Sequence, residues 1–366
     1  MAGVSSAHAA EAGMWALVTR GADAPPPADM AEARRWCARL AELASPVLAA
    51  HVLADASAAL GEALVDPKAV EESRLLARFR LQHQRGWAAA IAAQGIETVC
   101  LRGFAAGLTV FGDAALRAQG DMDLLVRECD LRALVSFLAG HGFRFFRPEM
   151  RRRWGMISDA SFLPFVSPDG ECDIDIHVLP DCYPAHLSLT TDRVFAAARR
   201  IEGEGGGLLA PSPSHAMTLC VTNAAKDKFD LFALRKVIDA VAMLRGGQAL
   251  DWDEILRLAR DGRCLKPARA FFCLLQRLGA PVGRVPPALL REPAGLARPV
   301  FERVVGDFRD LFATRPSMAE LWWREITLCA EPRVALHNAG LRLRGLVRPH
   351  EGLPAGLPAA ALPRAE

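Results

Sequence analysis

Two short acidic segments carry the side chains best suited to chemistry in this sequence, GDMDLLV at 120–126 and CDIDIHV at 172–178. Each shows the alternation of polar and apolar residues that is typical of a β-strand. In the first segment, Asp121 and Asp123 therefore project from one face of the strand, whereas Met122 points the other way. Two neighbouring carboxylates repel each other unless a cation lies between them, so this pair predicts a divalent metal site.

The second segment repeats this arrangement, with Asp173, Asp175 and His177 on one face. If the two strands are neighbours, three or four carboxylates converge, and such a group suits Mg²⁺ held by oxygen ligands and substrate phosphates. The alternative is that these are solvent-facing positions on half-buried strands, where the same alternation is normal. Two such strands within one small region favour the metal site.

A glycine turn, LRGFAAG at 101–107, precedes the first acidic segment. Gly103 permits close backbone approach, and the N-terminus of the following helix offers N–H groups to a phosphate. Arg102 and Arg117 are candidate phosphate contacts through charge-assisted hydrogen bonds. The alternatives are an ordinary strand-to-helix turn at Gly103 and surface positions for the two arginines.

The elements that must position these groups divide the chain into helical, mixed and helical regions. We expect an N-terminal segment over 1–28, a helical region over 29–94, an α/β core over 95–210, a helical region over 211–345 and a flexible tail over 346–366. The fold class predicted by this order is α+β.

Within the core, apolar runs and turn residues predict both strands and helices. The expected elements are strands over 96–101, 121–126 and 142–146, helices over 103–115 and 129–140, and a hairpin joining 161–166 to 171–178 through the turn SPDG.

The composition excludes several classes of protein. The 366 residues are 51% hydrophobic with a formal net charge of +2, which is typical of a globular chain and not of a disordered or strongly basic one. The nine cysteines are scattered without a Cys-x-x-Cys pair, as expected for reduced thiols in a cytoplasmic protein. The N-terminus lacks a secretory pattern, and charged residues interrupt the apolar region near 44–64, so we expect no membrane segment.

The stretch 101–145 resembles the uncharacterised nucleotidyltransferase family of bacteria, which belongs to the DNA polymerase beta-like nucleotidyltransferase superfamily. The resemblance is carried by Leu-Arg-Gly, Asp-Met-Asp-Leu-Leu-Val and a later Gly-Phe. Downstream, CDIDIHV is similar to the family's Val-Asp-Leu-His strand, and residues 219–244 are similar to its helical segment. The likeness implies a polymerase-beta-like core, a mixed sheet with helices, flanked by N-terminal and C-terminal helical regions.

The resemblance also implies roles for individual residues. Asp121, Asp123 and Asp175 would bind the metal and drive catalysis, with His177 as the companion of Asp175 and a contact for the nucleotide. Asp175 could also help to deprotonate the acceptor.

For the nucleotide itself, the resemblance implies that Gly103 and its helix face the triphosphate and that Lys226 reaches into the cleft from the C-terminal helical region. The alternative for Lys226 is a partly exposed position paired with an aspartate one turn on. Three residues depart from the family pattern: Arg102 replaces Lys, Phe104 replaces a small residue, and Asn223 replaces His.

These features predict an enzyme that uses Mg²⁺ or Mn²⁺ to move a nucleotidyl group from an NTP such as ATP to a hydroxyl-type acceptor. The acceptor is a small molecule, a protein side chain or a nucleic-acid end, and the near-neutral charge makes a long nucleic acid the least expected. Two other hypotheses remain open. One is a non-catalytic nucleotide-binding protein of the same fold that serves as a partner in a biosynthetic pathway, and the other is a metal-dependent phosphohydrolase.

Overall fold

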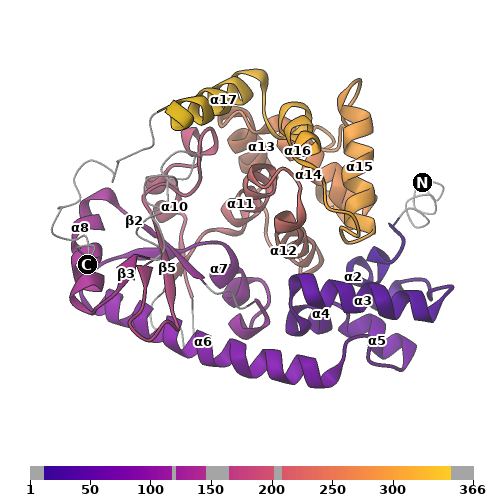
Figure 1. Ribbon diagram of the computed structural model, residues 1–366, viewed down its shortest axis with the longest axis horizontal. Coiled ribbons are helices and arrows are strands. Elements are labelled where there is room, and N and C mark those ends of the chain that lie inside the picture. Colours follow the sequence, from indigo (N-terminus) through magenta and orange to yellow (C-terminus); the bar gives the residue numbers. More distant parts are fainter. Residues whose placement is uncertain (1–11, 118–120, 146–164, 202–207, 348–366) are drawn as a thin grey trace. The chain divides into compact units, whose positions relative to one another are not determined.

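The computed structural model describes residues 12–117, 121–145, 165–201 and 208–347. The chain forms two compact units, each built from two separate stretches of sequence (Figure 1). The first unit combines Met1–Leu76 with Cys220–Glu331, and the second combines Ala77–Leu219 with Pro332–Glu366. Two of the three boundaries between the units fall within helices, α6 (Pro67–Ala93) and α11 (Pro213–Lys226), and the third lies between Glu331 and Pro332.

Seven strands of the second unit, counted over the described residues, form one mixed sheet in the order β3-β4-β5-β2-β1-β7-β6. They are β1 (Thr98–Cys100), β2 (Asp121–Val126), β3 (Arg144–Phe145), β4 (Phe165–Val166), β5 (Asp173–His177), β6 (Arg199–Arg200) and β7 (Leu209–Ala210). The acidic strands β2 and β5 are parallel neighbours near the middle of the sheet. The pair β1–β7 is also parallel, whereas the other neighbours are antiparallel.

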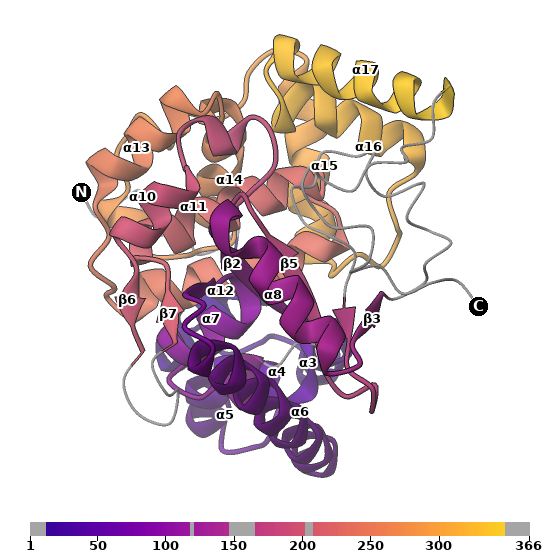
Figure 2. The same cartoon turned by 90° about the vertical axis from the view of Figure 1, so that its left-hand side faces the viewer.

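One face of this sheet is packed by helices α6 and α8 (Glu128–Gly140), and α8 lies against the strands in both views (Figures 1 and 2). Ile91 of α6 and Leu134 of α8 share a buried core with Met122 of β2 and Ile174 of β5. Because side chains alternate along a strand, burying these residues leaves the intervening acids on the opposite face. Among the described residues, the other α-helices that lie wholly within this unit are α7 (Arg102–Thr109), α10 (Thr191–Ala196) and α17 (Pro332–Val347).

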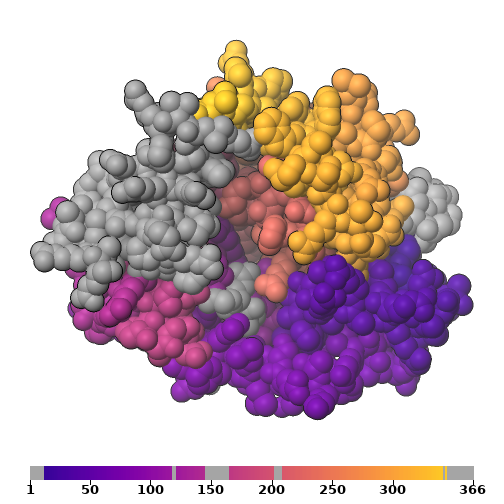
Figure 3. All heavy atoms as spheres, in the orientation of Figure 1, coloured from indigo at the N-terminus to yellow at the C-terminus, as the bar shows by residue number. Residues whose placement is uncertain are grey.

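The described part of the first unit is helical. Its N-terminal stretch contains α2 (Trp15–Thr19), α3 (Met30–Ala44), α4 (Pro46–Val52) and α5 (Ala54–Leu60). Its C-terminal stretch contains α12 (Leu234–Arg245), α13 (Trp252–Asp261), α14 (Leu265–Arg277), α15 (Ala297–Arg309), α16 (Met318–Arg324) and a π-helix, η7 (Glu325–Cys329). The two stretches are joined by a hydrogen bond from the buried Trp15 indole to the carbonyl oxygen of Phe308, with an Nε1–O distance of 2.7 Å. In the space-filling view the surfaces of these stretches, indigo and orange, adjoin (Figure 3).

Several predicted elements are confirmed, including a mixed α+β fold. The strand over 121–126 is β2, the helix over 129–140 is α8, and the predicted hairpin is the antiparallel pair β4–β5. Residues 161–164 of that prediction lie outside the described part. The single helix predicted over 103–115 is wrong: α7 ends at Thr109, and a short 3-10 helix, η2 (Ala114–Arg117), follows. Gly112 lies between them with φ +72°, a left-handed conformation that interrupts a right-handed helix.

Gly107 of α7 packs directly against the backbone of η2 at Ala114. A Cβ atom added there would lie 2.8 Å from Cα and 3.1 Å from the carbonyl oxygen of Ala114, so the backbone of η2 would have to move. We expect Gly107→Ala to lower the free energy of unfolding by about 1–3 kcal/mol, because overpacking against backbone is poorly relieved. The measurement is urea denaturation.

The matched control for this prediction is Gly140→Ala, in the last residue of α8. An added Cβ there meets no described atom within 4 Å, so we expect no loss of stability. Equal destabilisation by the two substitutions would contradict the packing argument.

Candidate functional site

The register of the two acidic strands decides which side chains meet. In the parallel pair β2–β5, Asp121 lies opposite Asp173 and Asp123 lies opposite Asp175. The condition set for the metal site, that the two acidic strands are neighbours, is therefore met. Asp123, Asp175 and His177 occupy one face of the sheet, on the side away from the α6–α8 core.

Asp123, Asp175 and His177 form a compact group that could hold a metal ion. Each offers one ligand atom, and these atoms all lie within 4.8 Å of one another. The exposed fractions are 2% for Asp123, 9% for Asp175 and 1% for His177, so the group is shielded from bulk water. Two carboxylate oxygens and an imidazole nitrogen are a suitable partial ligand set for a divalent cation that also binds substrate phosphates.

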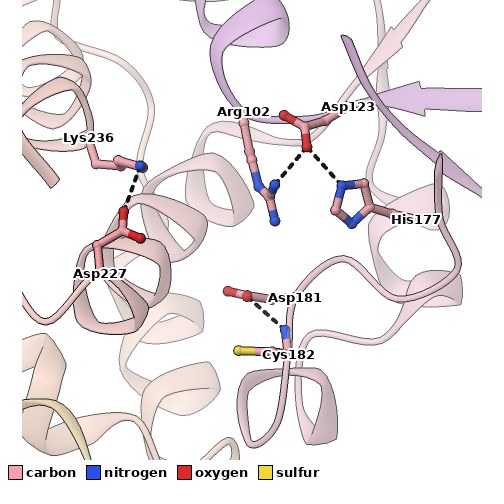
Figure 4. Close-up of polar contacts among 7 residues, drawn as sticks. All are labelled: Arg102, Asp123, His177, Asp181, Cys182, Asp227 and Lys236. Carbon is pink, nitrogen blue, oxygen red and sulfur yellow. Dashed lines mark hydrogen bonds and ion pairs between the residues drawn. The ribbon is translucent and has the colours of Figure 1, made fainter. Parts of the chain in front are cut away.

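Asp123 contacts both Arg102 and His177 through one carboxylate oxygen (Figure 4). Its Oδ1 atom lies 2.7 Å from Nη1 of Arg102 and 2.8 Å from Nε2 of His177. Its backbone carbonyl accepts a hydrogen bond from the N–H of Leu101, at 2.9 Å, and this bond ties the turn after β1 to β2. Arg102 and His177 therefore share one oxygen of Asp123, and a metal ion bound at Asp123 would compete with them for it.

Arg102 begins α7 with a backbone φ of +52°, in the left-handed region that costs a side-chain-bearing residue about 1–2 kcal/mol. The turn directs its guanidinium back to Asp123, where the arginine side chain is 18% exposed. Arg102 was predicted as a phosphate contact, and the structure adds a carboxylate partner for it. The phosphate contact itself stays a prediction.

Asp121 shares the face but does not belong to the metal-binding group found among the described residues. Burial raises the pKa of Asp121 above its usual range, and repulsion from the Asp123 charge raises it further. The nearby Arg102 partly opposes this rise. A role for Asp121 as a metal ligand stays a prediction. Asp121 lies two residues before Asp123 on β2, in the pair with Asp173 that precedes the Asp123–Asp175 pair on the same face.

The residues predicted to contact phosphate lie near the start of α7 and in η2. Gly103 is buried as the second residue of α7. Arg117 is 3% exposed, so its alternative interpretation as a surface arginine is wrong. Phe104, which stands where the family has a small residue, packs into the hydrophobic core. The phosphate contacts of Gly103 and Arg117 stay predictions.

Lys226 is the last residue of α11 and is half-buried. It belongs to the first unit, whereas the acidic face belongs to the second, and its predicted reach into the cleft stays a prediction. Its neighbours form ion pairs within the first unit. Asp227 contacts Lys236 at 2.7 Å (Figure 4), and Lys228 contacts Glu325 at 3.6 Å.

One residue near the site was not anticipated from the sequence, Asp181 in the loop after β5. It is 1% exposed, and its Oδ1 accepts a hydrogen bond from the backbone N–H of Cys182 at 2.7 Å. The residue lies outside the strand alternation that marked the other acids, so no periodic signal pointed to it. Its position, four residues after His177, was the only clue available.

A mixed sheet that brings two acidic strands together as parallel neighbours suits an enzyme acting on phosphates through a divalent cation. A family model, the uncharacterised nucleotidyltransferase family, matches residues 62–280, and the chain belongs to that family. Membership makes the protein a nucleotidyltransferase without naming its acceptor. No curated protein and no solved structure matches the chain significantly. None of the helices in the described residues is both long and apolar enough to cross a lipid bilayer.

Proposed function

We propose that this chain is a Mg²⁺- or Mn²⁺-dependent nucleotidyltransferase that moves a nucleotidyl group from an NTP, such as ATP, to a hydroxyl-type acceptor. The observation that carries the proposal is the convergence of Asp123, Asp175 and His177 on one shielded face of the sheet. These residues would hold the cation, with Asp121 next to them on the same face. The cation would supply charge neutralisation at the α-phosphate and an acidified acceptor hydroxyl.

The protein side chains would bind and orient the two reactants. Arg102 and the N-terminus of α7 at Gly103 would contact the triphosphate, with Arg117 and Lys226 as further candidates. The acceptor oxygen would attack the α-phosphorus, the bond from that phosphorus to the bridging oxygen would break, and pyrophosphate would leave. Asp175 would take the acceptor proton.

The same proposal includes a polymerase-beta-like core and a cytoplasmic location. The mixed sheet with its acidic strands and the family membership support the core, and the scattered cysteines support a reducing compartment. A small-molecule or protein acceptor is favoured over a long nucleic acid because the net charge is only +2. A protein partner from a biosynthetic pathway would be one source of the acceptor.

The test is transfer of label from α-labelled NTPs in the presence of Mg²⁺ or Mn²⁺ to a pool of metabolites and proteins. Labelled product together with released pyrophosphate supports the proposal. Nucleotide binding without turnover would indicate a binding protein, and release of inorganic phosphate without labelled acceptor would indicate a phosphohydrolase. The absence of both label transfer and nucleotide binding would remove the proposal.

His177 is expected to set the metal preference of the site. An imidazole nitrogen suits Mn²⁺ better than Mg²⁺, so His177→Gln should weaken Mn²⁺ binding about tenfold and Mg²⁺ binding by less than about threefold. Electron paramagnetic resonance of unbound Mn²⁺, with Mg²⁺ as competitor, measures both affinities. The control is His141→Gln, an exposed histidine after α8, which should change neither. Equal losses for the two ions in His177→Gln would show that His177 is not a ligand.

A further inference from the structure

Asp181 has a buried carboxylate, and its own loop provides a hydrogen-bond donor for only one of the two oxygens. One oxygen, Oδ1, accepts the hydrogen bond from Cys182, whereas the buried Oδ2 atom meets no hydrogen-bond donor among the described residues. The side chain is 1% exposed, so water does not compensate from bulk solvent. Burying a carboxylate oxygen without a hydrogen-bond donor costs free energy. Such an atom indicates that a ligand or another side chain donates to it in a different state of the protein.

The same close-up that draws Asp181 also draws a cationic side chain, Arg102 (Figure 4). In Figure 4 the guanidinium of Arg102 extends from α7 between the carboxylate of Asp123 and the loop that carries Asp181. It contacts Asp123 at 2.7 Å. Arg102 thus contacts the carboxylate of Asp123, and in Figure 4 the buried carboxylate of Asp181 is drawn on the other side of the guanidinium.

Metal binding to Asp123 conflicts with this ion pair. Oδ1 of Asp123 already accepts from Arg102 and lies 2.8 Å from His177. A divalent cation at the Asp123–Asp175–His177 group would repel the guanidinium at short range and compete for the same oxygen. A cation at this group favours release of Arg102 from Asp123, and a long arginine side chain can move by rotating about its own bonds.

We propose that Asp181 is a positioning residue that accepts Arg102 when a metal ion displaces it from Asp123. The guanidinium then donates to Oδ2 of Asp181, which satisfies the buried oxygen and keeps the positive charge beside the site. This exchange rests on the metal-binding part of the proposed function and adds to it a residue that coordinates no metal. It also explains why an arginine can sit on a metal-binding carboxylate without blocking the site permanently.

The test is a double-mutant cycle on Mn²⁺ affinity in the full-length chain, measured by electron paramagnetic resonance. Asp181→Asn keeps an Oδ1 acceptor for the Cys182 N–H, and it replaces the charged Oδ2 acceptor with an NH₂ group that cannot accept from Arg102. Alone, it should weaken Mn²⁺ binding about tenfold, because the displaced guanidinium loses a charge-assisted partner. Arg102→Gln should strengthen binding of Mn²⁺ without nucleotide, and Asp181→Asn added to Arg102→Gln should change the affinity by less than about twofold.

The outcomes separate the exchange from other roles. An equal loss from Asp181→Asn with and without Arg102 would mean that Asp181 acts on the metal directly, and no loss in either background would mean that it plays no part; both overturn the exchange. Asp192→Asn, an exposed aspartate of α10, controls for the loss of one charge in the same unit. If the wild type binds no Mn²⁺, the metal site of the proposed function fails as well. If the two substitutions are coupled in Mn²⁺ affinity but the protein transfers no label, the exchange of Arg102 between the two carboxylates is supported and the proposed transferase activity is refuted.

Discussion

Asp123→Asn is expected to slow label transfer by about a thousandfold and to abolish Mn²⁺ binding. A metal ion contributes several kcal/mol of transition-state stabilisation, and each 1.36 kcal/mol corresponds to roughly a tenfold change in rate. Asparagine keeps an oxygen that can accept from Arg102 and His177, so the local hydrogen bonds and the fold should survive. Steady-state kinetics with labelled NTP and Mn²⁺ titration measure the two effects.

The control for this substitution is Asp173→Asn. Asp173 lies on β5, on the same face as Asp175, but outside the metal-binding group of the described residues. Its loss should change the rate by less than about tenfold, as expected for a charge that only adjusts the local field. Thermal unfolding gives a second readout: Mn²⁺ should raise the melting temperature of the wild type and of Asp173→Asn, but not of Asp123→Asn. Full activity in Asp123→Asn would refute the assignment of the site.

The acidic strands show which features of the site can be predicted from local sequence and which cannot. Alternation along each segment predicted which side chains share a face, because a strand has a fixed two-residue period. It did not predict that β2 and β5 pair in parallel, or that Asp123 lies opposite Asp175. Pairing and register join residues more than fifty positions apart, and those depend on the whole sheet.

The residues of the site likewise differ in how well the sequence identifies them. Asp123, Asp175 and His177 could be proposed from spacing, but the preference for this group over one that includes Asp121 needs the register. Asp181 lies in a loop without periodicity, and its burial follows from tertiary packing alone. The ion pair between Arg102 and Asp123 depends on a left-handed turn at an arginine, which residue preferences do not predict.

The helical parts were recognised from their period, but their grouping was not. Sequence order suggested separate regions before and after the core, with boundaries near 29, 95, 211 and 346 that stay predictions. In the structure the first unit joins Met1–Leu76 to Cys220–Glu331. Contacts such as the hydrogen bond from Trp15 to Phe308 span most of the chain and leave no local signature in the sequence.

Arg324→Met is expected to lower the free energy of unfolding by about 3–5 kcal/mol, because it leaves the buried carboxylate of Asp307 without the guanidinium that donates to it. Arg324 is 1% exposed at the end of α16. Its guanidinium donates to Asp307 and, at 2.8 Å, to the carbonyl oxygen of Phe229. Asp307 is itself 5% exposed, so water cannot replace the lost donor. Urea denaturation measures the effect.

Two further variants separate the cost of a stranded charge from the cost of lost packing. Arg303 also contacts Asp307, at 3.3 Å, but its side chain is 50% exposed, so Arg303→Met should cost less than about 1 kcal/mol. The double variant Arg324→Met with Asp307→Leu should recover most of the stability lost in Arg324→Met, because neither charge is then left buried alone. Similar losses of stability for Arg303→Met and Arg324→Met would contradict this argument, and so would a double variant that recovers no stability. Either result would show that Arg324 stabilises the fold by packing and not by its buried ion pair with Asp307.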